Sequence, residues 1–354
     1  MKILVGVCGI GNGHLSRQTC VIEYLLEEGN EVVVATTDGN MEYFKNKFPD
    51  ISVVNVNIPW ITCNENGIDF VDCLKKYNDN NVDQYKSFFE FSIKVNNLFN
   101  GVADVIITDY EPNVAQYAYA VNKPLVCMEQ QSKFLYLDEK KTENFSIVEE
   151  INRLNYFFPK YDKKIISSFF PIEISDDNVE IVSPIVKEFD KVFVENQILV
   201  YFSPYSNSYK YKLVLDAISK LKYLNFVVYS QQKFDDYKSE NIIFKSFSSS
   251  FKDDMEKSVC LITTAGHQLL SEAISINRPV YVMPLDTYEQ NYNALMIETY
   301  GLGMKAKDIT SEEIECFYRN INNYLINIKE FKKVNNDNNW KNVLKRVLRK
   351  YDKK

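Results

Sequence analysis

Histidine is scarce in this chain of 354 residues, which contains only His14 and His267. A typical zinc site needs several histidine and cysteine ligands at short spacings. The seven cysteines are scattered, none forms a Cys-x-x-Cys pair, and their number is odd. The sequence therefore predicts neither a metal centre nor a disulfide framework. The cysteines are expected to be buried free thiols in a reducing compartment.

Long apolar runs and an excess of positive charge are also lacking. No run reaches the roughly 18 apolar residues of a membrane span. The N-terminus MKILVGVCGIGNGH has neither the basic region nor the small-residue cleavage site of a signal peptide. The net charge of −7 argues against bulk nucleic-acid binding, which favours basic surfaces. We expect a cytoplasmic protein with at most peripheral membrane contact, through a basic amphipathic helix at Trp340–Lys354.

Short apolar runs alternate with helical patterns along most of the chain, and many of these runs are rich in β-branched residues, as buried parallel strands are. In the first half they are Lys2–Cys8, Glu31–Thr36, Ile51–Ile58, Asp104–Thr108 and Pro124–Met128. In the second half they are Ile198–Ser203, Asn225–Tyr229, Ile242–Phe244, Val259–Thr263 and Val280–Met283. The aromatic segment Ser132–Ile166 is interpreted as helical.

This alternation predicts an α/β fold with two Rossmann-like, doubly wound parallel-sheet domains that face each other across a cleft. The first domain is placed at 1–185 and the second at 186–335. Breaks in the periodicity put the boundary near Pro184–Asn196. The remaining residues, 336–354, are expected to form a helix that packs back on the first domain.

The first strand leads directly into the glycine-rich turn Cys8-Gly9-Ile10-Gly11-Asn12-Gly13-His14. Glycines allow a sharp turn and the close approach of a ligand. Nicotinamide-binding domains begin in a similar way, and Asp38 after the second strand keeps that hypothesis open. His14, however, stands where the third glycine of a nicotinamide fingerprint is expected.

The segment Thr263–Gly303 predicts a second binding region. Gly266, His267 and Gln268 fall at a helix N-terminus, where free backbone N–H groups and the helix dipole favour a phosphate. Glu272 falls in the first two turns of the same helix, within reach of a ribose hydroxyl. Glu289-Gln290 is expected in the loop after the next strand, in position to meet a sugar.

This second region resembles the donor-binding segment of GT-B glycosyltransferases, the group that includes MurG-like and UDP-glucuronosyltransferase-like enzymes. The matching positions are Gly266, Glu272, Pro279, Pro284, Glu289, Gln290, Asn293, Ala294, Gly301 and Gly303. The segment departs from the family pattern at Asn277-Arg278-Pro279, where Gly-x-Pro is usual, and at the turn Ala265-Gly266-His267. Near the N-terminus, GIGNGHLSRQ is similar to a MurG-related branch with Gly-His-x-x-Arg, matched by Gly13, His14 and Arg17.

The resemblance implies a GT-B fold, with His14 as general base. An imidazole, with an ordinary pKa of about 6.5, accepts a proton near neutrality. Asp109, at the end of a strand, is the expected partner that orients His14, with Glu111 as a substitute. Two plainer interpretations stay open: a structural role for His14, and an Asp109 that only caps the next helix. Donor contacts are expected from Gly13, Ser203, Gly266, His267, Gln268, Glu272, Glu289 and Gln290.

The implied reaction is an inverting, metal-independent hexose transfer from a nucleotide sugar, most often a UDP-sugar in this family, to an acceptor hydroxyl. His267 and the helix N–H groups would stabilise the departing diphosphate. No cofactor is expected besides the donor, and the acceptor is expected to be a small molecule or a glycan. The alternatives are a nucleotide-sugar 2-epimerase of the same fold, a non-catalytic GT-B accessory subunit and the nicotinamide dehydrogenase.

Overall fold

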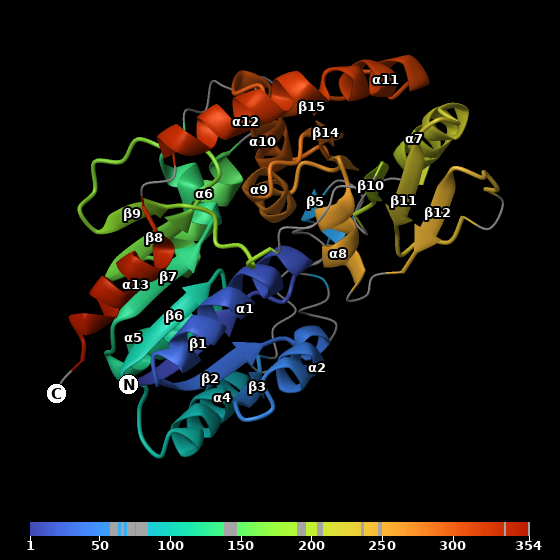
Figure 1. The fold of residues 1–354 in the computed structure, drawn as a ribbon. Helices are drawn as coiled ribbons and strands as arrows, with labels where there is room; N and C mark the ends of the chain where they lie inside the picture. The colour runs from blue at the N-terminus through green and yellow to red at the C-terminus, as the bar shows by residue number, and fades with distance from the viewer. Residues whose placement is uncertain are drawn as a thin grey trace.

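The computed structural model describes residues 1–56, 63–64, 67–68, 75, 84–137, 147–189, 196–203, 208–234, 237–246, 250–335 and 338–352. In these residues two large parallel sheets lie side by side, each with helices on both faces (Figure 1). A short antiparallel pair, β4 Cys63–Asn64 and β5 Gly67–Ile68, stands apart from them. The predicted two-sheet α/β architecture is confirmed.

The first sheet contains seven parallel strands in the order β3-β2-β1-β6-β7-β8-β9. Their bounds are β1 Lys2–Val7, β2 Glu31–Thr36, β3 Ser52–Asn55, β6 Val105–Asp109, β7 Leu125–Glu129, β8 Lys163–Ser167 and β9 Val179–Val182. The strand order reverses between β1 and β6, where Val7 pairs with Asp109. Ligands of open α/β sheets bind beside the carboxyl ends of strands at such a reversal.

Both faces of the first sheet are buried because successive residues of a strand point to opposite sides. Ile3 and Val5 of β1 pack in one apolar cluster with α1, α2 and α13, whereas Leu4 packs in another with α4 and α5. The helices of this domain are α1 Asn12–Glu27, α2 Asp38–Lys47, α4 Gln84–Leu98, α5 Pro112–Val121 and α6 Val148–Phe157, with the 3-10 turn η1 Gln131–Leu135.

The second sheet contains six parallel strands in the order β12-β11-β10-β13-β14-β15. Their bounds are β10 Gln197–Tyr201, β11 Asn225–Tyr229, β12 Ile242–Lys245, β13 Cys260–Thr263, β14 Val280–Val282 and β15 Gly303–Lys305. The helices are α7 Ser208–Lys220, α8 Ser250–Lys257, α9 His267–Ser275, α10 Tyr288–Thr299, α11 Ser311–Arg319 and α12 Ile321–Asn335. The strand order reverses between β10 and β13. The helix α9 begins just after β13, and therefore beside this reversal.

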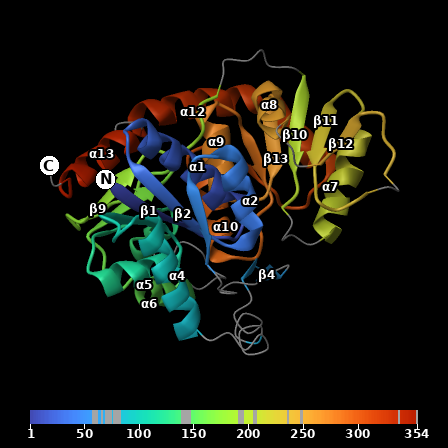
Figure 2. The same ribbon diagram turned by 90° about the horizontal axis from the view of Figure 1, so that it is seen from below.

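The chain returns to the first domain at its C-terminal end. Figures 1 and 2 show α12 running from the second domain toward the first, where α13 (Trp340–Arg349) follows. The Trp340 ring meets the Tyr24 ring of α1 edge-on, with 5.6 Å between the ring centres. Val343, Leu344 and Val347 are buried in the same cluster as β1. The apolar face of α13 is therefore covered by the protein itself.

Five strands were not predicted: the short pair β4 and β5, and β8, β9 and β15 of the large sheets. β8 lies within Ser132–Ile166, which was interpreted as helical; the structure has η1, α6 and then this strand. Its Ile165 and Ile166 are fully buried between β7 and β9, and the Lys164 ammonium lies over the Tyr161 ring at 4.3 Å from its centre. β9 has only four residues, with a glutamate among them, and β15 has only three, with a glycine among them, so neither forms a long apolar run. Among the described residues, no helix is long and apolar enough to cross a membrane.

Removing the Trp340 side chain should destabilise the first domain. The substitution Trp340→Ala empties a buried aromatic site, so the free energy of unfolding should fall by about 3 kcal/mol. Lys345→Ala on the same helix is the matched control, because it removes only an exposed pair with Glu28 and should cost about 0.5 kcal/mol or less. Urea unfolding followed by circular dichroism measures both. Equal midpoints for the two variants would contradict this packing.

Candidate active site

The glycine-rich turn after β1 brings α1 against the second domain. Gly11, just before α1, has a φ of 73°, a conformation that favours glycine. A Cβ atom added to Gly13 would lie 3.2 Å from Cβ of Gln268 on α9, which is a tight contact that requires a small local shift. Gly13 thus brings the backbone of α1 close to the first turn of α9.

His14 and Asp109 meet at the reversal of the strand order in the first sheet. His14 lies in the first turn of α1 and Asp109 is the last residue of β6. Nδ1 of His14 is 2.7 Å from Oδ1 of Asp109. The second ring nitrogen, Nε2, is 3.2 Å from Nε2 of Gln131 in η1. Because Asp109 is an acceptor when ionised, it selects the tautomer with hydrogen on Nδ1 and leaves Nε2 as a proton acceptor.

The Asp109 carboxylate is completely buried and accepts four hydrogen bonds. Besides His14, Arg17 donates from Nε at 2.9 Å and from its terminal nitrogen at 2.8 Å, and Gln18 donates from its amide at 2.9 Å. Burial alone would raise the pKa of Asp109, but the charges and hydrogen bonds of Arg17 and His14 outweigh it and hold that pKa below its ordinary value. Asp109 is therefore a carboxylate at neutral pH.

Glu111 does not share this site. Its Oε1 accepts hydrogen bonds from the backbone N–H of Asn113 at 2.9 Å and from the Asn113 side chain at 2.7 Å, so Glu111 is the cap of α5. Burial raises the pKa of Glu111 to about 7. The expectations that Glu111 substitutes for Asp109, and that Asp109 caps the next helix, are both wrong. Between the two carboxylates, Tyr110 has a φ of 57°, so the chain turns there and Asp109 faces His14 while Glu111 caps α5.

His267 is the first residue of α9, with Gly266 as the N-cap. The imidazole is only 3% exposed and packs against the rings of Phe169 and Phe170, at 5.1 and 6.2 Å between ring centres. Burial, together with the positive charges of Lys133 and Arg17, holds the pKa of His267 well below its ordinary value, so the ring is neutral. Its Nε2 makes no hydrogen bond to any described residue. This buried, unpaired nitrogen lies at a helix N-terminus, where an anion is favoured.

Gln268 and Glu272, one turn apart on α9, contact α1 of the first domain. The Gln268 amide donates to Oε1 of Glu272 at 3.0 Å and accepts from Arg17 at 3.3 Å. The Ser16 hydroxyl donates to the same Glu272 oxygen at 2.7 Å. Burial raises the pKa of Glu272. A single side chain, Arg17, thus touches both Asp109 and the N-terminal turn of α9.

The other predicted donor residues of the second domain are Glu289, Gln290 and Ser203. Glu289 and Gln290 are in the first turn of α10 and not in a loop. Oε1 of Glu289 accepts from the Gln130 amide at 2.9 Å, which is another bond between the domains. Oε1 of Gln290 accepts from the backbone N–H groups of Ala265 and Leu285, at 3.1 and 3.0 Å, and so ties two loops together. Ser203 follows β10 and is nearly buried, and its carbonyl accepts from the Tyr211 hydroxyl.

Three residues of the site were given no role by the sequence. Arg17 and Gln18 fall three and four positions after His14, which places all three on one helix face; that spacing was the available signal. Gln131 carried no such signal beyond its place just after a strand. Nearby, burial lowers the pKa of Lys133 to about 8, and its ammonium donates to the Gln130 side chain.

Comparisons with solved structures place this fold among known enzymes. The spinosyn forosaminyltransferase SpnP superposes with a TM-score of 0.68 at 11% identity, over 99% of both chains. UGT2 of Phytolacca americana, complexed with UDP-2-fluoro-glucose and pterostilbene, gives 0.72 at 12% identity, over 100% of both chains. A UDP-glucosyltransferase of Polygonum tinctorium, in complex with 3,4-dichloroaniline, gives 0.71 at 13% identity, over 99% of this chain and 98% of the other. The two sheets therefore form a GT-B fold.

Sequence comparison agrees with this fold. No curated protein sequence matches the chain. The sequence model of the family described as glycosyl transferase family 1 matches residues 1–322, which is most of the chain. The protein is therefore a glycosyltransferase and belongs to glycosyl transferase family 1.

Proposed function

We propose that this glycosyltransferase moves a hexose from a UDP-sugar to an acceptor hydroxyl with inversion at the anomeric carbon, and that His14 is the general base. The observation that carries the proposal is the 2.7 Å contact between His14, in the first turn of α1, and the buried carboxylate of Asp109, at the end of β6. A carboxylate in this position holds the imidazole in one tautomer and stabilises its protonated form. Nε2 is then the atom that takes the proton.

The proposed step is a single displacement. The acceptor O–H proton passes to Nε2 of His14, the acceptor oxygen bonds to the anomeric carbon, and the bond from that carbon to the diphosphate breaks. The electron pair leaves with the diphosphate. Attack from the face opposite the leaving group inverts the configuration. An imidazole beside an ionised carboxylate that accepts four hydrogen bonds is oriented for this transfer without rearrangement.

The second domain would supply the donor contacts. We assign the diphosphate to the N-terminus of α9, where free N–H groups and the unpaired Nε2 of His267 meet. Glu272 is assigned to the ribose, and Glu289 with Gln290 to the hexose. The helix N–H groups and His267 would then stabilise the negative charge of the departing diphosphate. In this proposal the reaction needs neither a metal nor a further cofactor. Two similar structures are described with small aromatic molecules, which supports a small-molecule acceptor over a glycan.

A donor panel tests this assignment directly. UDP-, dTDP- and GDP-sugars are compared by thermal shift and by nucleotide release, with NADH as the competing ligand. A UDP-sugar should raise the melting temperature and be consumed when an acceptor phenol or alcohol is present. Stabilisation by NADH alone would overturn the proposal.

Replacing the base should separate catalysis from donor binding. His14→Ala should lower the transfer rate by about 10²- to 10⁴-fold, which is the usual contribution of a general base. The thermal shift given by UDP-glucose should stay the same, because the proposed donor contacts lie on the second domain. Retained turnover in His14→Ala would exclude this residue as the base.

His267 should contribute no charge to donor binding. Burial and nearby positive charges hold its pKa well below the ordinary value, so His267 stays neutral throughout the neutral pH range. The affinity for UDP, measured by calorimetry across neutral pH, should therefore depend on pH in the same way in the wild type and in His267→Gln. The same variant should bind UDP about tenfold more weakly at every pH, since one hydrogen bond to a charged group is lost. A pH step unique to the wild type would show a charged His267 instead.

A further inference from the structure

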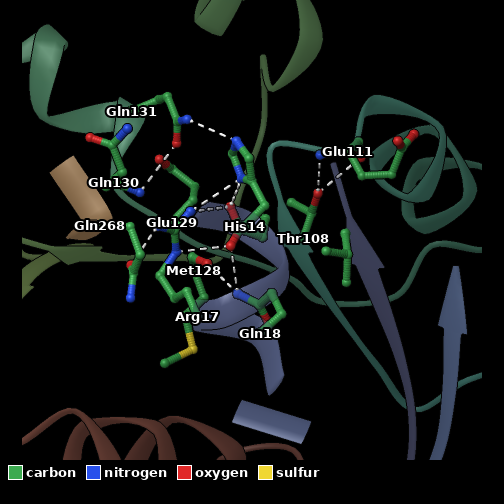
Figure 3. A network of polar contacts seen from close by, with 12 residues as sticks. His14, Arg17, Gln18, Thr108, Glu111, Met128, Glu129, Gln130, Gln131 and Gln268 are labelled. Carbon is green, nitrogen blue, oxygen red and sulfur yellow. Dashed lines mark hydrogen bonds and ion pairs between the residues drawn. The ribbon is translucent and has the colours of Figure 1, made fainter. Parts of the chain in front are cut away.

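Nε2 of His14 already has a hydrogen-bond partner in this structure. Gln131 approaches it with its amide nitrogen at 3.2 Å (Figure 3). At the other end of that amide, Oε1 accepts a long hydrogen bond of 3.4 Å from the backbone N–H of Gln130, which agrees with this orientation. Because Asp109 holds the hydrogen on Nδ1, Nε2 has one lone pair, and the Gln131 N–H occupies it.

The surroundings hold Gln131 in this place. Both His14 and Gln131 are about nine-tenths buried, and the Tyr110 ring stacks on His14 at 6.3 Å between ring centres. Gln131 is the first residue of η1, directly after β7. That turn is anchored by Glu129, whose carboxylate accepts the backbone N–H of Ser132 at 2.9 Å. Packing and hydrogen bonds therefore hold the Gln131 amide in a defined position in the site.

A base with a free Nε2 lone pair beside an activated sugar exposes a transferase to donor hydrolysis. Water could lose a proton to Nε2 of His14 while its oxygen bonds to the anomeric carbon and the diphosphate leaves with the electron pair. The donor would then be hydrolysed to UDP and free sugar, and no sugar would reach the acceptor. A base whose only lone pair accepts an amide N–H cannot take that proton until the amide moves away.

We propose that Gln131 is a positioning residue that caps Nε2 of His14 and releases it to an acceptor hydroxyl, which suppresses donor hydrolysis. This inference rests on the proposed function of His14 as the base. A water molecule gains nothing by replacing the amide, since it exchanges one hydrogen bond for another. An acceptor brings binding energy from the rest of its structure, and that energy moves the amide aside.

The test compares Gln131→Met, which keeps the length of the side chain but has no N–H, with the wild type. UDP-glucose hydrolysis without acceptor, measured as UDP release, should rise roughly five- to tenfold, the factor that corresponds to one neutral hydrogen bond. The KM for an acceptor should fall by a similar factor while kcat for transfer stays nearly constant. The double variant His14→Ala/Gln131→Met should lose the added hydrolysis, because the freed base causes it.

Ser132→Ala is the matched control. Ser132 is the next residue of the same turn, and its hydroxyl makes no hydrogen bond to a described residue. Its removal should change neither hydrolysis nor the acceptor KM. Gln131→Leu is a second variant without an N–H, and circular dichroism verifies that each variant is folded.

A spectroscopic measurement tests the cap without any turnover. The chain has only two histidines, so the ¹⁵N imidazole signals can be assigned with His267→Gln. In Gln131→Met and Gln131→Leu, the Nε2 signal of His14 should move to the position of an unbonded nitrogen, and in Ser132→Ala it should not move.

The outcomes separate the two proposals. If the wild type transfers sugar but both Gln131 variants hydrolyse UDP-glucose at the wild-type rate, the cap is overturned. An unchanged Nε2 signal in both variants overturns it as well. If the wild type neither binds nor transfers any nucleotide sugar, the proposed function fails, and the Nε2 signal still decides whether Gln131 bonds His14.

Discussion

The buried Asp109 carboxylate is the interaction on which the site depends. An ionised group without solvent must be paired, and removing one partner of a buried pair costs about 3 to 5 kcal/mol. Here the pairing comes from Arg17, His14 and Gln18, all on one face of α1. These hydrogen bonds to Asp109 fix the rotation of α1 about its own axis relative to β6. The imidazole is oriented by the same set of contacts.

Arg17 extends this constraint into the second domain. Its guanidinium bonds Asp109 with two nitrogens and also donates to Gln268 at the start of α9. Ser16 and Gln130 add bonds to Glu272 and Glu289. One apolar cluster continues across the same boundary and contains Phe134 and Phe170 of the first domain with Tyr288 and Tyr292 of the second. The proposed base and the proposed phosphate site are thus held relative to each other by side chains that cross between the domains.

Most of the fold could be predicted because buried parallel strands have a distinctive composition. Runs such as Asp104–Thr108 are apolar, β-branched and bounded by polar residues, and the structure has strands there. β8 was missed because two lysines open it and aromatic residues precede it, which imitates an amphipathic helix. β15 has three residues, one of them Gly303, and pairing with β14 defines it as a strand. Short strands of this kind have no local signal because their stability comes from a neighbouring strand.

The sequence alone determined the two-domain α/β class, the turns at His14 and at Gly266, and the resemblance to GT-B enzymes, since strand composition and turn residues are local properties. The catalytic and donor-binding roles of these residues stay predictions. Only the tertiary structure decided that Asp109, and not Glu111, faces His14, that His267 is buried and neutral, and that Gln131 occupies the imidazole lone pair. Each of these depends on which side of a strand or turn a residue presents and on what another segment, often more than ninety residues away, places against it. Burial and pairing of charges are properties of that assembly, so no local pattern specifies them.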